Sequence, residues 1–160
     1  MKFSRRVLLI FATLASLVGA NLLVSTSAQA ASSAQAATSC SGTISADYTF
    51  TYPGEGVIGE LTIYYNSSNG GTNSACFYHR GSAAGVAAET YVAIMRCSQT
   101  SGEGQTCHNN TAPNDDLGTY SSYAGPVGVT GTANNCVGAI GWIVWHGITV
   151  GRGTPITAGC

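Results

Sequence analysis

Residues 57–65 read VIGELTIYY, with Leu61, Ile63 and Tyr65 on one face and Glu60, Thr62 and Tyr64 on the other. Alternation with a period of two is typical of a strand that rests one face on a core. Asn69-Gly70-Gly71 follows as a strong turn signal, and residues 75–79 form a second short run. This stretch predicts a β-hairpin and indicates the fold class of the chain around it.

The chain on either side of this hairpin repeats the same pattern. Tyr48, Phe50 and Tyr52 alternate with threonines, and the polar segment over residues 98–118 is expected to be a long loop. Glycines in the last apolar run are expected to bend or bulge it. The pattern predicts an all-β fold, a small antiparallel β-sandwich or barrel. Its further strands are expected over residues 44–52, 87–97, 123–130 and 137–150.

The first thirty residues carry an export signal. Lys2, Arg5 and Arg6 precede the apolar stretch 7–18, and Ala28-Gln29-Ala30 matches a small-x-small cleavage site. We therefore expect residues 1–30 to be a cleaved signal peptide that leaves no membrane anchor. Residues 31–39 would be a flexible lead-in and residues 40–160 a single β domain. The paired arginines leave both the general and the twin-arginine export routes open.

Charge excludes several classes of function for the exported part. Arg80, Arg96 and Arg152 remain against seven carboxylates, so its formal charge is −4, and its only lysine leaves with the signal. A mildly acidic domain without lysine has no patch that follows phosphates, so nucleic acid is not an expected partner. It also has no side-chain amine for Schiff-base chemistry. Its many serines and threonines are typical of proteins that meet walls, coats or polysaccharide.

All six cysteines follow the signal, and an even number in an exported domain indicates a disulfide framework. Zinc is the competing interpretation, but no C-x-x-C spacing supports it. The sequence alone does not select one pairing. Position favours closing the polar loop with one short-range bond, tying the two ends of the domain together and joining two central strands. These bonds would be Cys97–Cys107, Cys40–Cys160 and Cys76–Cys136.

No motif identifies a reaction. His79, His108 and His146 are widely spaced and form no metal-binding pattern, so neither a metal nor a cofactor is expected. A serine hydrolase elbow of the form G-x-S-x-G is absent. The nearest carboxylate pairs, Glu55 with Glu60 and Asp115 with Asp116, could serve a glycosidase, but their neighbours favour turns.

Aromatic side chains give the best indication of a ligand, because exposed rings stack on the C–H faces of sugars. They also build cores, which in so small a domain is the commoner use. The candidate sugar platform consists of Tyr48, Phe50, Tyr52, Trp142 and Trp145.

Three stretches resemble a known family. Residues 61–68 lead through the Gly/Asn turn to Cys76, Tyr123-Ala124-Gly125-Pro126-Val127 precedes Cys136-Val137, and the chain ends on Cys160. Over residues 55–137 and the last cysteine, this arrangement resembles the small exported actinobacterial proteins called spore-associated protein A.

The resemblance implies a location on spores or aerial growth outside the membrane, and it brings no catalytic residues. It also implies that terminal cysteines pair with each other and central cysteines with each other, in agreement with the choice from position. The chain departs from the family pattern in its Cys97 and Cys107 pair and in its apolar segment 142–146. Either departure leaves open a role that differs from that of the family members found on spores.

The sequence thus supports three hypotheses. The first is a non-enzymatic exported protein associated with the cell or spore surface, with cell-wall or spore-coat polymers as partners. The second is a carbohydrate-binding module that uses the aromatic platform. The third is a small secreted hydrolase, which would need a carboxylate pair or a Ser–His pair in contact.

Overall fold

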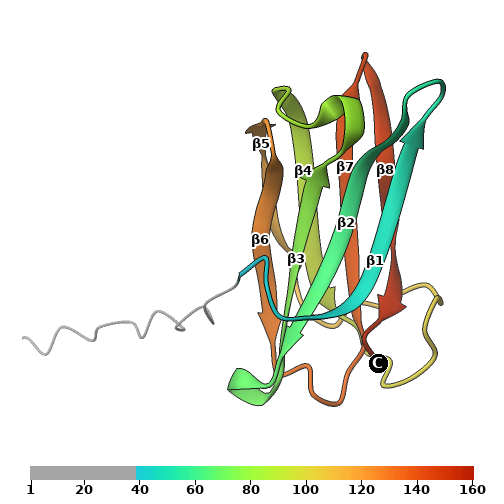
Figure 1. The fold of residues 1–160 in the computed structure, drawn as a ribbon. Helices are drawn as coiled ribbons and strands as arrows, with labels where there is room; N and C mark the ends of the chain where they lie inside the picture. The colour runs from blue at the N-terminus through green and yellow to red at the C-terminus, as the bar shows by residue number, and fades with distance from the viewer. Residues whose placement is uncertain (1–38) are drawn as a thin grey trace, which may run out of the picture. The chain divides into compact units, whose positions relative to one another are not determined.

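Residues 39–160 are described by a computed structural model, and they form two antiparallel sheets of four strands each (Figure 1). The expected signal peptide and all but the last residue of the lead-in lie outside the described residues. The first sheet has the order β1-β2-β3-β6 and the second β5-β4-β7-β8. The predicted all-β fold is confirmed, and its two facing sheets make it a sandwich. The strands are β1 (Thr43–Tyr52), β2 (Gly56–Asn66), β3 (Thr72–His79), β4 (Ala88–Arg96), β5 (Asn114–Tyr120), β6 (Tyr123–Thr130), β7 (Val137–Trp145) and β8 (Ile148–Ala158).

The hairpin that the sequence predicted is β2–β3. Its register runs from Gly59 opposite His79 to Asn66 opposite Thr72, and the Asn69-Gly70-Gly71 turn closes it. Leu61 and Ile63 are fully buried, as their alternation predicted. Glu60, Thr62 and Tyr64, which alternate with them, therefore lie on the outer face of the first sheet.

Two expectations about strands were wrong. Residues 98–118 were expected to be a loop, but residues 114–120 form β5, which pairs with β4 along the edge of the second sheet. Residues 137–150 were expected to be one strand, but His146 and Gly147 turn the chain between β7 and β8 with φ angles of 49° and 79°. At β5 the open edge of β4, which no local pattern reveals, decides the conformation, whereas at residues 146–147 the two-residue turn decides it.

Phe77 lies at the centre of the core between the sheets. Its ring touches two glycines, Gly59 on the neighbouring β2 and Gly141 on β7 of the opposite sheet. A Cβ atom on either glycine would come within 2.5 Å and 2.6 Å of the ring, respectively. These positions therefore stay free of side chains so that one large ring can span the sandwich.

The disulfide pairing corrects the sequence-based choice. Cys97–Cys107 is present as predicted, but the other bonds are Cys40–Cys76 and Cys136–Cys160. Cys76 pairs in register with Thr62 and so faces outward from the first sheet, away from Cys136 at the start of β7. Cys160 follows β8, whose last pair with β7 is Val137 with Ala158, so it ends beside Cys136.

Candidate functional site

The outer face of the first sheet gathers polar and aromatic side chains from all four strands. Register pairs place Asp47 opposite Thr62, Glu60 opposite Tyr78, and Tyr78 opposite Tyr123. Because residues paired in register share a face, one surface carries all of them. We call it the tyrosine–carboxylate face; it consists of Asp47, Glu60, Thr62, Tyr64, Tyr78, Arg80 and Tyr123.

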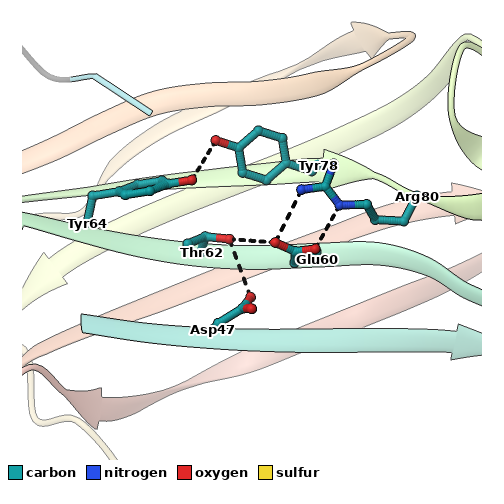
Figure 2. A network of polar contacts seen from close by, with 6 residues as sticks. All are labelled: Asp47, Glu60, Thr62, Tyr64, Tyr78 and Arg80. Carbon is teal, nitrogen blue, oxygen red and sulfur yellow. Dashed lines mark hydrogen bonds and ion pairs between the residues drawn. The ribbon is translucent and has the colours of Figure 1, made fainter. Parts of the chain in front are cut away.

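Glu60 anchors the polar network that Figure 2 shows. Arg80 donates to both of its carboxylate oxygens, from Nε at 2.7 Å and from Nη2 at 3.2 Å. The hydroxyl of Thr62 lies 3.1 Å from Glu60 Oε1 and 3.4 Å from Asp47 Oδ1, so one donor serves two carboxylates. The hydrogen bonds from Arg80 lower the pKa of Glu60, which keeps this carboxylate ionised at neutral pH.

Two tyrosine hydroxyls meet on the same face. Tyr64 and Tyr78 are hydrogen-bonded at 2.8 Å, and desolvation together with this bond raises the pKa of Tyr78 (Figure 2). The Tyr78 ring lies between the Arg80 guanidinium, 4.5 Å from its centroid, and the Tyr123 ring, whose centroid is 5.6 Å away. Tyr123 is 40% exposed and presents an aromatic surface to solvent.

This arrangement matches a ligand that is rich in hydroxyl groups. The carboxylates accept hydrogen bonds, tyrosine hydroxyls both donate and accept, and the Tyr123 ring offers an apolar surface. Sugars combine these requirements, because their rings carry hydroxyls at the edge and C–H groups on the faces. The Arg80–Glu60 ion pair and the hydrogen bonds from Thr62 to Glu60 and Asp47 hold these polar groups in place before a ligand binds.

The five aromatics of the predicted platform do not share one surface. Tyr48, Phe50 and Tyr52 are half-buried against the core, and Phe50 stacks on Phe77 with centroids 5.8 Å apart. Trp145 is buried at 7% exposure. Trp142 alone lies on the outer face of the second sheet, where it stacks on Tyr91.

Glu55 binds three side chains at the end of the sandwich where the β1–β2 and β7–β8 turns lie. It accepts from Trp145 Nε1 at 3.1 Å and from the hydroxyl of Ser82, and His146 Nε2 lies 2.9 Å from its other oxygen. The carboxylate thus stands between Ser82 and His146, so the imidazole does not contact the serine hydroxyl through these bonds. A serine nucleophile needs that direct contact with its base.

The two members of each predicted carboxylate pair do not act together in the structure. Glu55 binds the turn cluster while Glu60 binds Arg80. Asp115 and Asp116 are consecutive residues of β5 and therefore face opposite ways. Asp116 accepts from the Tyr120 hydroxyl at 2.5 Å and from the Gly125 backbone at 2.7 Å, which ties β5 to β6.

His79 is a core histidine. Its Nε2 lies 2.7 Å from the Thr90 hydroxyl and its Nδ1 lies 3.2 Å from the Val86 carbonyl. His79 therefore links β3 to β4 and to the segment just before β4. Desolvation lowers its pKa and keeps the ring neutral. Within residues 39–160, no group of three or more histidine, cysteine or acidic side chains could hold a metal ion. In the same residues, no helix is long and apolar enough to cross a membrane.

Comparison of the chain with protein-family models, curated proteins and solved structures found no match.

Sequence reasoning missed the tyrosine–carboxylate face, although its signal was present. The outward positions of residues 57–65 are Glu60, Thr62 and Tyr64, and Tyr78 and Arg80 follow at the end of the predicted hairpin. The alternation places Glu60, Thr62 and Tyr64 only on the face opposite Leu61 and Ile63. The sequence pattern does not reveal the strand order. That order places Asp47 of β1 next to β2 and Tyr123 of β6 next to β3.

Proposed function

We propose that this chain is a non-enzymatic protein, exported from the cell, that attaches to the cell or spore surface by binding a neutral polysaccharide at the tyrosine–carboxylate face. Three disulfides and the absence of a membrane-spanning helix among the described residues suit such a location. The resemblance to spore-associated protein A supports the same assignment.

The observation that carries the proposal is the exposed Tyr123 ring next to a held network of hydrogen-bonding groups. Tyr123 contacts Tyr78, and Tyr78 contacts both Tyr64 and Arg80. Stacking on an aromatic ring and hydrogen bonding to fixed carboxylates are the two contacts that a sugar ring accepts at once.

Charge favours a neutral ligand. Asp47 and Glu60 lie on the face, and the described residues carry three arginines against seven carboxylates. An anionic polymer such as a teichoic acid or nucleic acid would be repelled. Neutral chains such as chitin or cellulose meet no such barrier, and their hydroxyls donate to the carboxylates.

The hydrolase hypothesis is less well supported. A glycosidase needs one carboxyl group that is protonated at neutral pH, and this requires a raised pKa. Hydrogen bonds from Arg80 lower the pKa of Glu60, and the hydrogen bond from Ser82 lowers that of Glu55. Glu55 and Glu60, the two carboxyls with the most side-chain partners, are thus held in the ionised form.

Binding to insoluble polysaccharides tests the proposal. The purified protein would be mixed with chitin, cellulose and peptidoglycan, and the bound fraction measured against concentration. We expect saturable binding to chitin or cellulose, the two neutral polymers, and Tyr123→Ala should weaken it by about tenfold, or about 1.4 kcal/mol. Asp47→Asn should weaken it as well, because an acceptor for a sugar hydroxyl loses its charge.

Ile148→Ala is the matched control, because it also removes an exposed apolar side chain but lies on β8, in the other sheet. It should leave the affinity unchanged. No binding to any of the three polymers, or equal losses in Tyr123→Ala and Ile148→Ala, would contradict the proposal. Labelled protein added to whole cells should show a surface fraction that Tyr123→Ala reduces.

A further inference from the structure

The second sheet also carries an aromatic pair on its outer face. Tyr91 on β4 lies opposite Trp142 on β7, and their rings stack with centroids 5.4 Å apart and planes 22° apart. Their neighbours along the strands, Val92 and Ile143, are fully buried and face the core. The pair therefore faces away from the core, on the side of the sandwich opposite to the tyrosine–carboxylate face.

The strands on either side leave the pair accessible. Leu117 on β5, opposite Tyr91, is 58% exposed and extends the apolar surface. Gly151 on β8, opposite Trp142, has no side chain to cover the indole. A Cβ atom at Gly151 would come within 2.5 Å of the Trp142 Cα and 2.2 Å of the Gly141 carbonyl oxygen, so close packing of the backbone keeps this position bare.

The other end of the same face is covered by the loop between β4 and β5. Cys107 in this loop packs with Met95 and Ile140, and the Cys97–Cys107 disulfide holds it there. Hydrogen bonds from Gly104 and Cys107 to the β8 backbone add to the attachment. The loop thus covers the apolar side chains near it, while Tyr91 and Trp142 lie outside this cluster and stay partly exposed.

Charge around the pair resembles that of the first face. Glu89 lies on the same face as Tyr91, two residues before it on β4, and Asp115 lies two residues before Leu117 on β5. Desolvation and the charge of Asp115 raise the pKa of Tyr91, so its hydroxyl stays protonated at neutral pH. The surface therefore offers stacking rings and acceptors, which suit a neutral sugar, and repels anionic polymers.

We infer that Tyr91 and Trp142 form a second saccharide-stacking site, and that the sandwich, with one site on each outer face, binds two polysaccharide chains and cross-links them. The class of ligand rests on the proposed function, whereas the second site rests on the Tyr91–Trp142 geometry alone. The two sheets lie back to back, so a single polymer segment cannot contact both faces without passing around an edge of the sandwich.

Cross-linking is measured separately from binding. The protein would be titrated into a suspension of fine particles of the polysaccharide that binds best, and flocculation followed by light scattering. The wild-type protein should flocculate the particles, with an optimum at intermediate protein concentration, as expected for a bridging molecule. Trp142→Ala should remove flocculation while the bound fraction falls only in part. Tyr123→Ala should do the same, and the double variant should lose both flocculation and binding.

Thr149→Ala is the control, because Thr149 is exposed and its register partner Val144 lies on the same outer face as Trp142. It should flocculate like the wild type. Near-ultraviolet circular dichroism and thermal unfolding would establish that each variant is folded, and Trp142→Phe, which keeps a ring, should retain most of the flocculation. Flocculation that survives Trp142→Ala in a folded protein would overturn the inference.

Tryptophan fluorescence provides a second readout. The chain has two tryptophans, and Trp145 is buried. A soluble oligosaccharide of the same polymer should shift the emission of Trp145→Phe, which reports Trp142, but not that of Trp142→Phe. This shift should persist in a Tyr123→Ala background, so the second site is detectable even if the first binds nothing.

Another set of results would separate the second site from the proposed function. If Tyr123→Ala abolishes binding and Trp142→Ala changes neither flocculation nor fluorescence, the proposed function stands and the second site is wrong. Sedimentation without sugar tests the other occupant of this face, a second copy of the chain. A dimer that Trp142→Ala dissociates would also overturn the inference.

Discussion

Glu60 connects several side chains of the tyrosine–carboxylate face. Its two oxygens are bound by Arg80, and one of them also lies within reach of Thr62, whose hydroxyl approaches Asp47. Arg80 in turn covers one side of the Tyr78 ring. Removal of the Glu60 charge would therefore release both the guanidinium and the tyrosine beneath it.

Replacement of Glu60 by glutamine should lower the free energy of unfolding at pH 7 by about 1 kcal/mol or less, because the pair is partly exposed to solvent. The pKa of Glu60 is lower in the folded state than its ordinary value of 4.5. Its stabilisation is therefore complete above pH 4.5 and is lost as the pH falls through the folded pKa. Urea unfolding of both proteins along a descending pH series should show the difference shrinking below about pH 4.5.

Glu103→Gln is the matched control, because Glu103 is exposed in the loop between β4 and β5. Its free energy of unfolding at pH 7 should match that of the wild type. A difference between Glu60→Gln and the wild type that stays constant down to about pH 2 would contradict the assignment of this stabilisation to an ionised Glu60.

The β7–β8 hairpin shows what decides structure at the scale of an element. His146 and Gly147 both have positive φ angles, as a two-residue turn between twisted strands requires. Histidine tolerates this conformation better than branched residues do. The same residue places its ring against Trp145, with centroids 4.9 Å apart, and its Nε2 on Glu55.

Two substitutions separate these roles of His146. His146→Val should destabilise the protein by about 1 kcal/mol, because a branched side chain is strained at positive φ. His146→Asn keeps the turn and loses the contact with Glu55, which is exposed and screened by solvent, so its unfolding midpoint should stay near that of the wild type. Thermal unfolding of the pair measures the difference. Equal losses in the two variants would show that the Glu55 contact, and not the turn, matters here.

At the scale of the whole molecule, the disulfides connect parts of the chain that the sheets bring together. Cys40–Cys76 fastens the segment before β1 to the outer face of β3, and Cys136–Cys160 closes the β7–β8 hairpin. In the chain-entropy model, bonds that close loops of these lengths each contribute about 3 to 4 kcal/mol. They make a domain of this size more resistant to unfolding.

Trypsin distinguishes the observed pairing from the one expected from position. The enzyme cleaves after Arg80, Arg96 and Arg152, and Cys40 and Cys76 both precede the first of these cuts. Without reducing agent, the fragment that ends at Arg80 should therefore be released with its disulfide inside it. The fragment 97–152 should stay joined to residues 153–160, and mass spectrometry reads both results.

The pairing expected from position predicts a different digest. Cys40–Cys160 and Cys76–Cys136 would join the fragment that ends at Arg80 to fragments 97–152 and 153–160. Its appearance in one large disulfide-linked product would contradict the structure. A digest under reducing conditions is the control, because it should release every fragment separately.

Local patterns predicted the elements whose own residues carry a strong signal. The alternation around Leu61 and Ile63 and the Asn69-Gly70-Gly71 turn predicted the β2–β3 hairpin, because periodicity and turn chemistry depend on neighbours in sequence. β5 could not be predicted in this way. Its Asn114-Asp115-Asp116 start is typical of a turn, and only the open edge of β4 makes it a strand.

The sequence by itself determined that this protein is an all-β domain with three disulfides, because alternation, turns and an even number of cysteines are properties of the chain alone. The tertiary structure decided which cysteines pair, which aromatics are buried and which polar residues form a face. Tyr48 and Phe50 looked like a platform and pack against the core, whereas Asp47, Tyr78 and Tyr123 became one surface. The reason is physical: strand order and the direction in which each sheet faces the other are set by packing between distant segments, and no local pattern encodes them.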